Sequence, residues 1–162
     1  IIILIYTFIY IYYGNTKMNP ENSEFLKQFR GCFTGILRWP QFDELLETIR
    51  SEQQNWYIYA IGETPPETSS DWESTLNFIT EINDLIKKEH DESYCGVVYV
   101  DDKSSPTMVK IFDPNNLGVS CGFSDNPPLP GWIMSLKKPD NLSEILQPAK
   151  RRRWWSNIFK KS

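Results

Sequence analysis

The strand-like segments of this chain gather late in the sequence, and only one helical segment separates the first of them from the rest. Runs rich in aromatic and β-branched residues predict strands at residues 56–61, 94–100, 107–112, 118–123 and 132–136. Consecutive strands joined by short connections pair antiparallel, whereas parallel strands need a long crossover. We therefore predict an α+β fold: a single domain with a four- or five-stranded, mostly antiparallel sheet and helices packed on one face.

Apolar residues at helical spacing predict four helices around this sheet. The first covers residues 25–37 and is loosened by two glycines, and the second covers residues 40–52. The third covers residues 70–88 and is the clearest, because a capping-box pattern starting at Ser70 precedes a long apolar stripe. A second capping-box pattern opens a short fourth helix within residues 141–148.

Length and composition indicate one folded domain with an extension at each end. The chain has 162 residues, of which 40% are hydrophobic, and this is enough apolar material for a core. Residues 1–17 form an apolar extension, shorter than the roughly 20 residues of a membrane span and without the basic start of a signal peptide. Its residues have A/T-rich codons, and we predict that native translation starts at Met18, so that this extension is not native. The α+β domain is then residues 18–147, and residues 148–162 form a C-terminal tail.

Charge is distributed unevenly between the domain and the tail. The net charge is −4, yet the last thirteen residues contain six Lys or Arg and no Asp or Glu, and subtracting those six charges leaves −10 for the rest. Phosphate contacts need clustered cations, so this acidic remainder argues against a nucleic-acid-binding surface on the folded domain. Only the tail has such a cluster.

The tail combines cations with large apolar side chains, which is the composition of interfacial peptides. Indole rings settle at the level of lipid headgroups, while Arg and Lys bind anionic lipid. We predict that the tail docks on an anionic membrane surface or a protein partner. Two alternatives stay open: stacking of tryptophan on single-stranded nucleic acid, and folding back onto the acidic domain or plain disorder. The candidate binding residues are Lys150, Arg151, Arg152, Arg153, Trp154, Trp155, Ile158, Phe159, Lys160 and Lys161.

Cysteine usage indicates a reduced, cytoplasmic protein, with peripheral membrane contact through the tail as a refinement. The three cysteines, Cys32, Cys95 and Cys121, form no C-x-x-C pair, and we expect mostly buried thiols. The single histidine, His90, follows the third helix, and we expect it to be exposed to solvent there. A Cys–His dyad with Cys95 or Cys121 stays formally open.

Sequence motifs give little support for catalysis. Residues 118–122 match G-x-S-x-G, but the prolines that follow cannot start the helix that a nucleophile elbow requires, and no histidine comes later in the chain. Phosphate-binding glycine loops and metal-ligand spacings are absent from the sequence, so we predict neither a cofactor nor a metal. A candidate ligand loop spans residues 113–131, because long ordered loops dense in Pro, Gly and Asn often have a task. Its candidate residues, with the tryptophan that follows, are Asp113, Asn115, Asn116, Cys121 and Trp132.

These features together favour a non-catalytic interaction or accessory module. The acidic domain would meet a protein partner, and the cationic aromatic tail would dock on an anionic membrane or on that partner. The alternatives are contact with single-stranded nucleic acid through the tail and a small cysteine-dependent enzyme. The sequence leaves the partner and the oligomeric state open.

Overall fold

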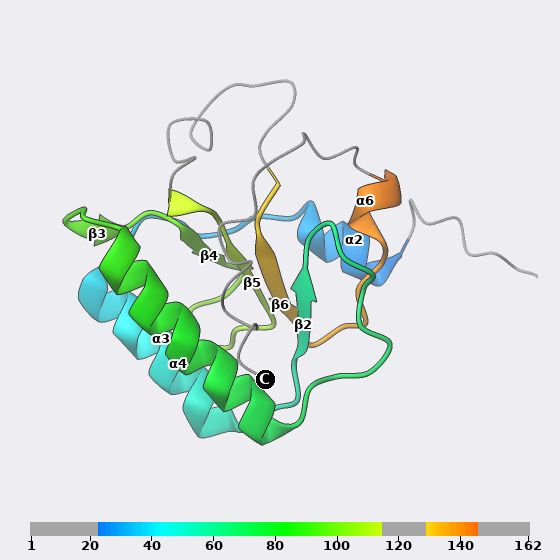
Figure 1. Ribbon diagram of the computed structural model, residues 1–162, viewed down its shortest axis with the longest axis horizontal. Coiled ribbons are helices and arrows are strands. Elements are labelled where there is room, and N and C mark those ends of the chain that lie inside the picture. Colours follow the sequence, from blue (N-terminus) through cyan, green and yellow to red (C-terminus); the bar gives the residue numbers. More distant parts are fainter. Residues whose placement is uncertain (1–22, 115–128, 146–162) are drawn as a thin grey trace, which may run out of the picture.

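An antiparallel sheet with helices on both faces organises the part of the chain that the computed structural model describes, residues 23–114 and 129–145 (Figure 1). The main sheet has four strands in the order β2-β6-β5-β4, and a separate two-stranded sheet pairs β1 with β3. The elements are α2 (Glu24–Phe29), β1 (Leu37–Arg38), α3 (Trp39–Glu52), β2 (Tyr57–Ala60), α4 (Trp72–Glu89), β3 (Tyr94–Cys95), β4 (Val98–Val100), β5 (Met108–Ile111), β6 (Trp132–Ser135) and α6 (Leu142–Ile145). The predicted α+β class and antiparallel pairing are confirmed.

Strand β6 forms the centre of the main sheet because it pairs with β2 on one side and β5 on the other. All four of its residues are buried, so both of its faces lie in the core. Trp132 and Met134 point into one hydrophobic cluster and Ile133 into another, as the two-residue period of a strand requires. The sheet therefore separates two cores.

The two long helices, α3 and α4, cover one face of the main sheet side by side (Figure 1). Helix α3 buries Phe42, Leu45, Leu46 and Ile49, as its sequence pattern predicts. Helix α4 begins one residue later than its capping-box pattern suggests, because Asp71 is the N-cap and its carboxylate accepts a hydrogen bond from the backbone N–H of Ser74 at 2.7 Å.

The opposite face of the sheet is covered by the short helices α2 and α6. Phe25 and Leu26 of α2 pack with Tyr59, Ile133 and Leu142 in the second cluster. The Tyr59 hydroxyl also accepts a hydrogen bond from the backbone N–H of Leu142 at 3.2 Å, and this bond ties α6 to the sheet. The sequence prediction placed the helices on one face; the two long helices share one face, whereas the short helices α2 and α6 occupy the other.

Lys110 of β5 lies on this second face. It is close to Phe29, the last residue of α2, and to Phe33, which follows that helix. Its Nζ atom lies 4.2 Å from the centroid of the Phe29 ring and 3.7 Å from that of Phe33. The same atom donates a hydrogen bond to the Phe29 carbonyl oxygen at 2.6 Å. Burial lowers the pKa of Lys110 to about 8. The ammonium group is thus held by ring faces and one carbonyl.

The first predicted helix is too long. The observed helix α2 ends at Phe29, and residues 33–38 run beside β4 and β3 instead. Thr34 and Val100 exchange two backbone hydrogen bonds of 2.8 and 3.0 Å, which a helix in this region could not form. A Cβ on Gly35 would lie 2.3 Å from the Tyr99 ring, so the close approach of the two segments requires glycine. Pairing with a distant strand has overridden the local helical spacing.

The predicted strand at residues 94–100 is divided into β3 and β4, with Gly96 and Val97 between them. Its predicted hairpin partner is confirmed as β5, which pairs antiparallel with β4. Residues 1–22, 115–128 and 146–162 lie outside the described residues, and with them the predicted strand at 118–123 and both terminal extensions. Within the described ranges, none of the helices combines the length and apolar character needed to cross a bilayer.

Candidate binding pocket

The two-stranded sheet of β1 and β3 carries apolar side chains on both of its faces. Its inner face holds Leu37 and Cys95, which lie opposite each other and are 1% and 0% exposed. Its outer face carries Tyr94, which is 38% exposed. Ile36, the residue that precedes β1, is 59% exposed. Within the described ranges, these two are the large hydrophobic side chains that are more than a third exposed. Both therefore lie at one place on the surface.

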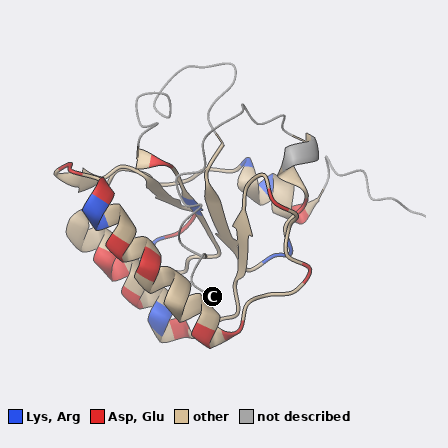
Figure 2. Cartoon of the chain, viewed as in Figure 1, with Lys and Arg blue, Asp and Glu red and all other residues tan. Residues whose placement is uncertain are grey.

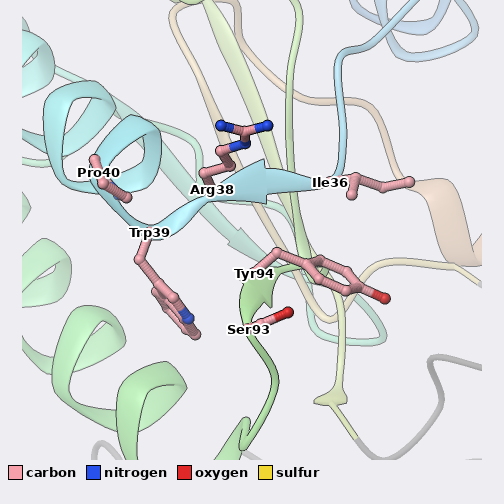
Figure 3. A pocket seen from close by; sticks show the side chains of 6 residues that line it. All are labelled: Ile36, Arg38, Trp39, Pro40, Ser93 and Tyr94. Atoms are coloured by element: carbon pink, nitrogen blue, oxygen red, sulfur yellow. The ribbon is translucent and has the colours of Figure 1, made fainter.

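An open pocket of about 420 Å³ lies at this sheet, and we call it the ribbon pocket (Figure 3). In Figure 3 the Ile36 side chain and the Tyr94 ring extend in the same direction, while Arg38 and Trp39 project to opposite sides of the chain. The lining therefore combines two exposed apolar groups, an indole, a cation and two hydroxyls. The lining residues are Ile36, Arg38, Trp39, Pro40, Ser93 and Tyr94.

The backbone of Ile36 adopts a left-handed conformation with φ of 56°. This conformation places the Cβ of an L-residue against its own carbonyl oxygen and costs roughly 1–2 kcal/mol, and a β-branched residue tolerates it poorly. Strained residues of this kind concentrate at binding and catalytic sites. Ile36 is both strained and exposed, so neither backbone preference nor core packing explains an isoleucine here.

Arg38 occupies the N-cap position of α3, where Ser, Thr, Asp or Asn would stabilise the helix better. The backbone N–H of Arg38 donates a hydrogen bond to the Gln41 side chain at 2.9 Å. The capping hydrogen bond at this position is therefore made by a side chain of the helix. Its guanidinium is exposed and forms none of the ion pairs found among the described residues. The first turn of α3 contains no acidic side chain, so the partial positive charge of the helix end adds to that of Arg38.

His90 supports the pocket from below, and its predicted exposure is wrong. The residue is only 4% exposed, and its Nε2 atom lies 2.9 Å from the Tyr94 carbonyl oxygen and 3.2 Å from the Gly96 backbone nitrogen. The imidazole also makes edge contacts with Trp39 and Tyr94, at centroid distances of 5.9 and 6.5 Å. His90 is buried because the chain turns at the end of α4 to enter β3, and this turn covers the ring.

The hypothesis of a Cys–His dyad gains no support from the surroundings of Cys95. Its thiol is buried, and burial raises its pKa to about 11. The thiolate is the nucleophile in cysteine chemistry, and such a thiol keeps its proton at neutral pH. The Nε2 atom of His90 meanwhile faces backbone groups of the β3 segment. The alternative partner, Cys121, lies outside the described residues.

The acidic residues that flank β4 serve the hairpin. Asp101 accepts hydrogen bonds from the backbone N–H groups of Thr107 and Met108, both at 3.0 Å. Burial alone would raise the pKa of Asp101, but these bonds and that of the Thr107 hydroxyl lower it below its usual value. In the described ranges, His, Cys, Asp and Glu side chains do not gather into a group of three that could hold a metal ion.

The other residues singled out from the sequence are dispersed. Trp132 lies in the core at 5% exposure and packs against Phe78 at a centroid distance of 5.1 Å. Asp113 follows β5 and is half-buried. Asn115, Asn116, Cys121 and all ten tail residues lie outside the described residues. The candidate ligand loop and the tail therefore stay predictions.

The sequence does contain a signal for the ribbon pocket that the sequence analysis did not use. Arg38-Trp39-Pro40 begins a helix with an arginine in place of a short polar cap. The exposure of Ile36 and Tyr94 has no comparable local signal, because it depends on the pairing of segments more than fifty residues apart.

Fold and pocket together define a small α+β domain with a surface pocket built on a two-stranded ribbon. Comparison with known proteins gives no match at a significant level, whether against family models, curated proteins or solved structures.

Proposed function

We propose that this protein is a non-catalytic interaction module. Its folded domain binds a protein partner through the ribbon pocket, and its cationic tail makes a second contact with an anionic membrane surface. One observation carries the proposal of a protein partner: three unusual residues line the same pocket. These are Ile36, which is strained and exposed, Tyr94, which is exposed, and Arg38, which forms no ion pair among the described residues. Natural sequences break local rules mainly where function requires it, and here the departures coincide.

The charge of the long helices supports a protein partner over nucleic acid for the folded domain. Helices α3 and α4 contain eight acidic and three basic residues, and red predominates on their outward side in Figure 2. We call this surface the acidic helix layer. The ion pair of Lys87 with Asp43, at 2.6 Å, joins the two helices. Arg50 and Lys88 pair with Glu47 and Glu89, and the other five acids form no ion pair among the described residues. Such a surface repels a phosphate backbone.

The role of the pocket is tested by Ile36→Gly, with Gln53→Gly as a matched control. Among the residues that the structure describes, Gln53 is the other non-glycine residue with a left-handed backbone, at φ of 49°, and it lies at the far end of α3. Both changes relieve backbone strain, so we expect each to raise the free energy of unfolding by about 1 kcal/mol. Ile36→Gly also removes an apolar contact surface of the pocket, and Gln53→Gly does not.

Peptides selected on the full chain from a displayed random library provide the readout. We expect Ile36→Gly to weaken their binding by about tenfold, which corresponds to about 1.4 kcal/mol, while Gln53→Gly binds like the wild type. Fluorescence anisotropy measures the affinities, and denaturant unfolding measures the stabilities. Equal affinity of the wild type and Ile36→Gly would contradict a binding role for the pocket.

The proposed role of the tail rests on the charge split of the sequence and is tested separately. We expect the full chain to co-sediment with vesicles that contain anionic lipid, and deletion of residues 150–162 to abolish this. Replacing Arg151, Arg152 and Arg153 by glutamine should weaken binding more than a hundredfold, at about 1 kcal/mol for each cation near the surface. The matched control neutralises Arg30, Lys88 and Lys103, which are exposed cations of the domain.

Two outcomes would replace the membrane proposal. If single-stranded oligonucleotides shift the full chain at moderate salt and vesicles do not, the tail binds nucleic acid. If neither binds, the membrane and nucleic-acid roles both fail, which leaves docking on the acidic helix layer, the surface of opposite charge, or plain disorder of the tail.

A further inference from the structure

We infer that the ligand of the ribbon pocket is a peptide segment with a single carboxylate next to an apolar side chain. The carboxylate binds Arg38, and the apolar side chain packs on Ile36 and Tyr94. This inference rests on the proposed function, since it names the chemical class of the partner segment that the pocket takes.

The charge of the pocket selects the carboxylate. Six other cations of the described residues form ion pairs, including Lys27 with Glu24 and Lys138 with Glu67. The exposed cations Arg30, Arg38 and Lys103 form no ion pair among the described residues, and of these three only Arg38 lines the pocket. A guanidinium offers a planar pair of donors that matches a carboxylate in a bidentate geometry. A free Arg38 in the lining is therefore complementary to an acidic side chain or a chain terminus.

Neighbouring acids limit the charge of the ligand. Asp91 and Glu92 are exposed and directly precede Ser93 and Tyr94 of the pocket. A phosphate or a run of acidic residues would bring two or more negative charges near these side chains, and like charges repel. A single carboxylate satisfies Arg38 with the least repulsion. The pocket therefore favours an isolated Asp, Glu or C-terminus over a phosphorylated segment.

The apolar half of the ligand follows from Ile36 and Tyr94. Covering two exposed apolar groups removes their surface from water, and tyrosine supplies contact area at a low cost in conformational entropy. Trp39 is fixed for contact because its Nε1–H donates to the Glu92 carbonyl oxygen at 2.9 Å and its ring rests on His90.

The test compares Arg38→Glu with Arg30→Glu in the full chain. Arg30 is also exposed and lies outside the pocket, so both variants change the net charge equally. We expect the random peptide library to yield wild-type binders with one Asp or Glu beside a large apolar residue. Arg38→Glu should weaken these binders at least tenfold and should instead select peptides with Lys or Arg at that place, whereas Arg30→Glu should change neither.

The outcomes separate this inference from the proposed function. Suppose that the selected peptides lack an acidic residue, bind Ile36→Gly more weakly and bind Arg38→Glu as tightly as the wild type. This result would overturn the inference of a carboxylate in the ligand and leave the pocket as a binding site. Tighter binding of phosphopeptides than of the matching glutamate peptides would overturn the inference that the ligand carries a single negative charge. If the protein self-associates and the selected peptides disrupt that association, the occupant of the pocket is a second copy of the chain. The inference of a separate partner would then be overturned. Failure to select any peptide would overturn the proposed function itself.

Discussion

At the scale of single residues, the pocket is marked by choices that folding alone would not favour. Asparagine or glycine would suit the left-handed backbone of position 36, and serine or aspartate would suit the N-cap at position 38. Tyr94 exposes a large ring beside the buried His90. The choices at positions 36 and 38 cost stability, and all three side chains line one pocket.

Lys110 gives the sharpest pH dependence at this scale. Its folded pKa of about 8 lies below the usual lysine value of 10.5, because burial penalises the charged form. Between these values the unfolded chain binds more protons than the folded one, so stability rises with pH. Below about pH 8 both forms are charged, and the folded protein carries the full burial cost. The Phe29 and Phe33 rings offset part of that cost by cation–π attraction.

We expect the stability of the wild type relative to Lys110→Met to increase by about 1–3 kcal/mol between pH 7.5 and pH 10.5. Denaturant unfolding of both proteins across this range measures the difference, and the subtraction removes groups that titrate alike in both. A constant difference would mean that Lys110 keeps its ordinary pKa in the folded protein.

At the scale of secondary-structure elements, the outcome of sequence reasoning depended on how local each signal is. Helices α3 and α4 follow from apolar spacing within one segment, and so does the hairpin of β4 and β5. The first helix failed beyond Phe29 because residues 33–38 gain more from pairing with β4 and β3 than from continuing the helix. Gly35 was visible as a weak point in a helix, but its tight contact with Tyr99 was not.

The ribbon pocket was not predictable by the same reasoning. Its two strands are two residues each, too short to show an alternating pattern in the sequence. The residues that line it come from two segments, 36–40 and 93–94, which pairing alone brings together. His90 was misjudged for the same reason: a polar residue after a charged helix end reads as solvated, and only the turn into β3 buries it.

At the scale of the whole molecule, Cys95 connects the pocket to the main core. Its side chain lies beneath the ribbon in the cluster that α3 and α4 form with the sheet. Alkylation of this thiol therefore needs an opening of that core, because the buried thiol, with its pKa of about 11, forms little thiolate at neutral pH. Cys32 is exposed and serves as the internal reference.

We expect iodoacetamide at neutral pH to modify Cys32 in the native protein and to modify Cys95 only when denaturant unfolds the chain. Peptide-level mass spectrometry distinguishes the two sites. Labelling of Cys95 at the rate of Cys32 under native conditions would show that the ribbon detaches from the core, and the pocket would then lack a fixed base.

The alternation of the ribbon has a consequence for how this protein can change over evolutionary time. Leu37 and Cys95 anchor the ribbon in the interior, while positions 36, 38 and 94 face outward. In the proposed binding role, substitutions at these outward positions change the ligand that the pocket takes and leave the buried anchor of the ribbon in place. We expect a library that varies only these positions to yield variants with new binding targets on the same scaffold, with stability shifting where the strain at position 36 or the N-cap at position 38 changes.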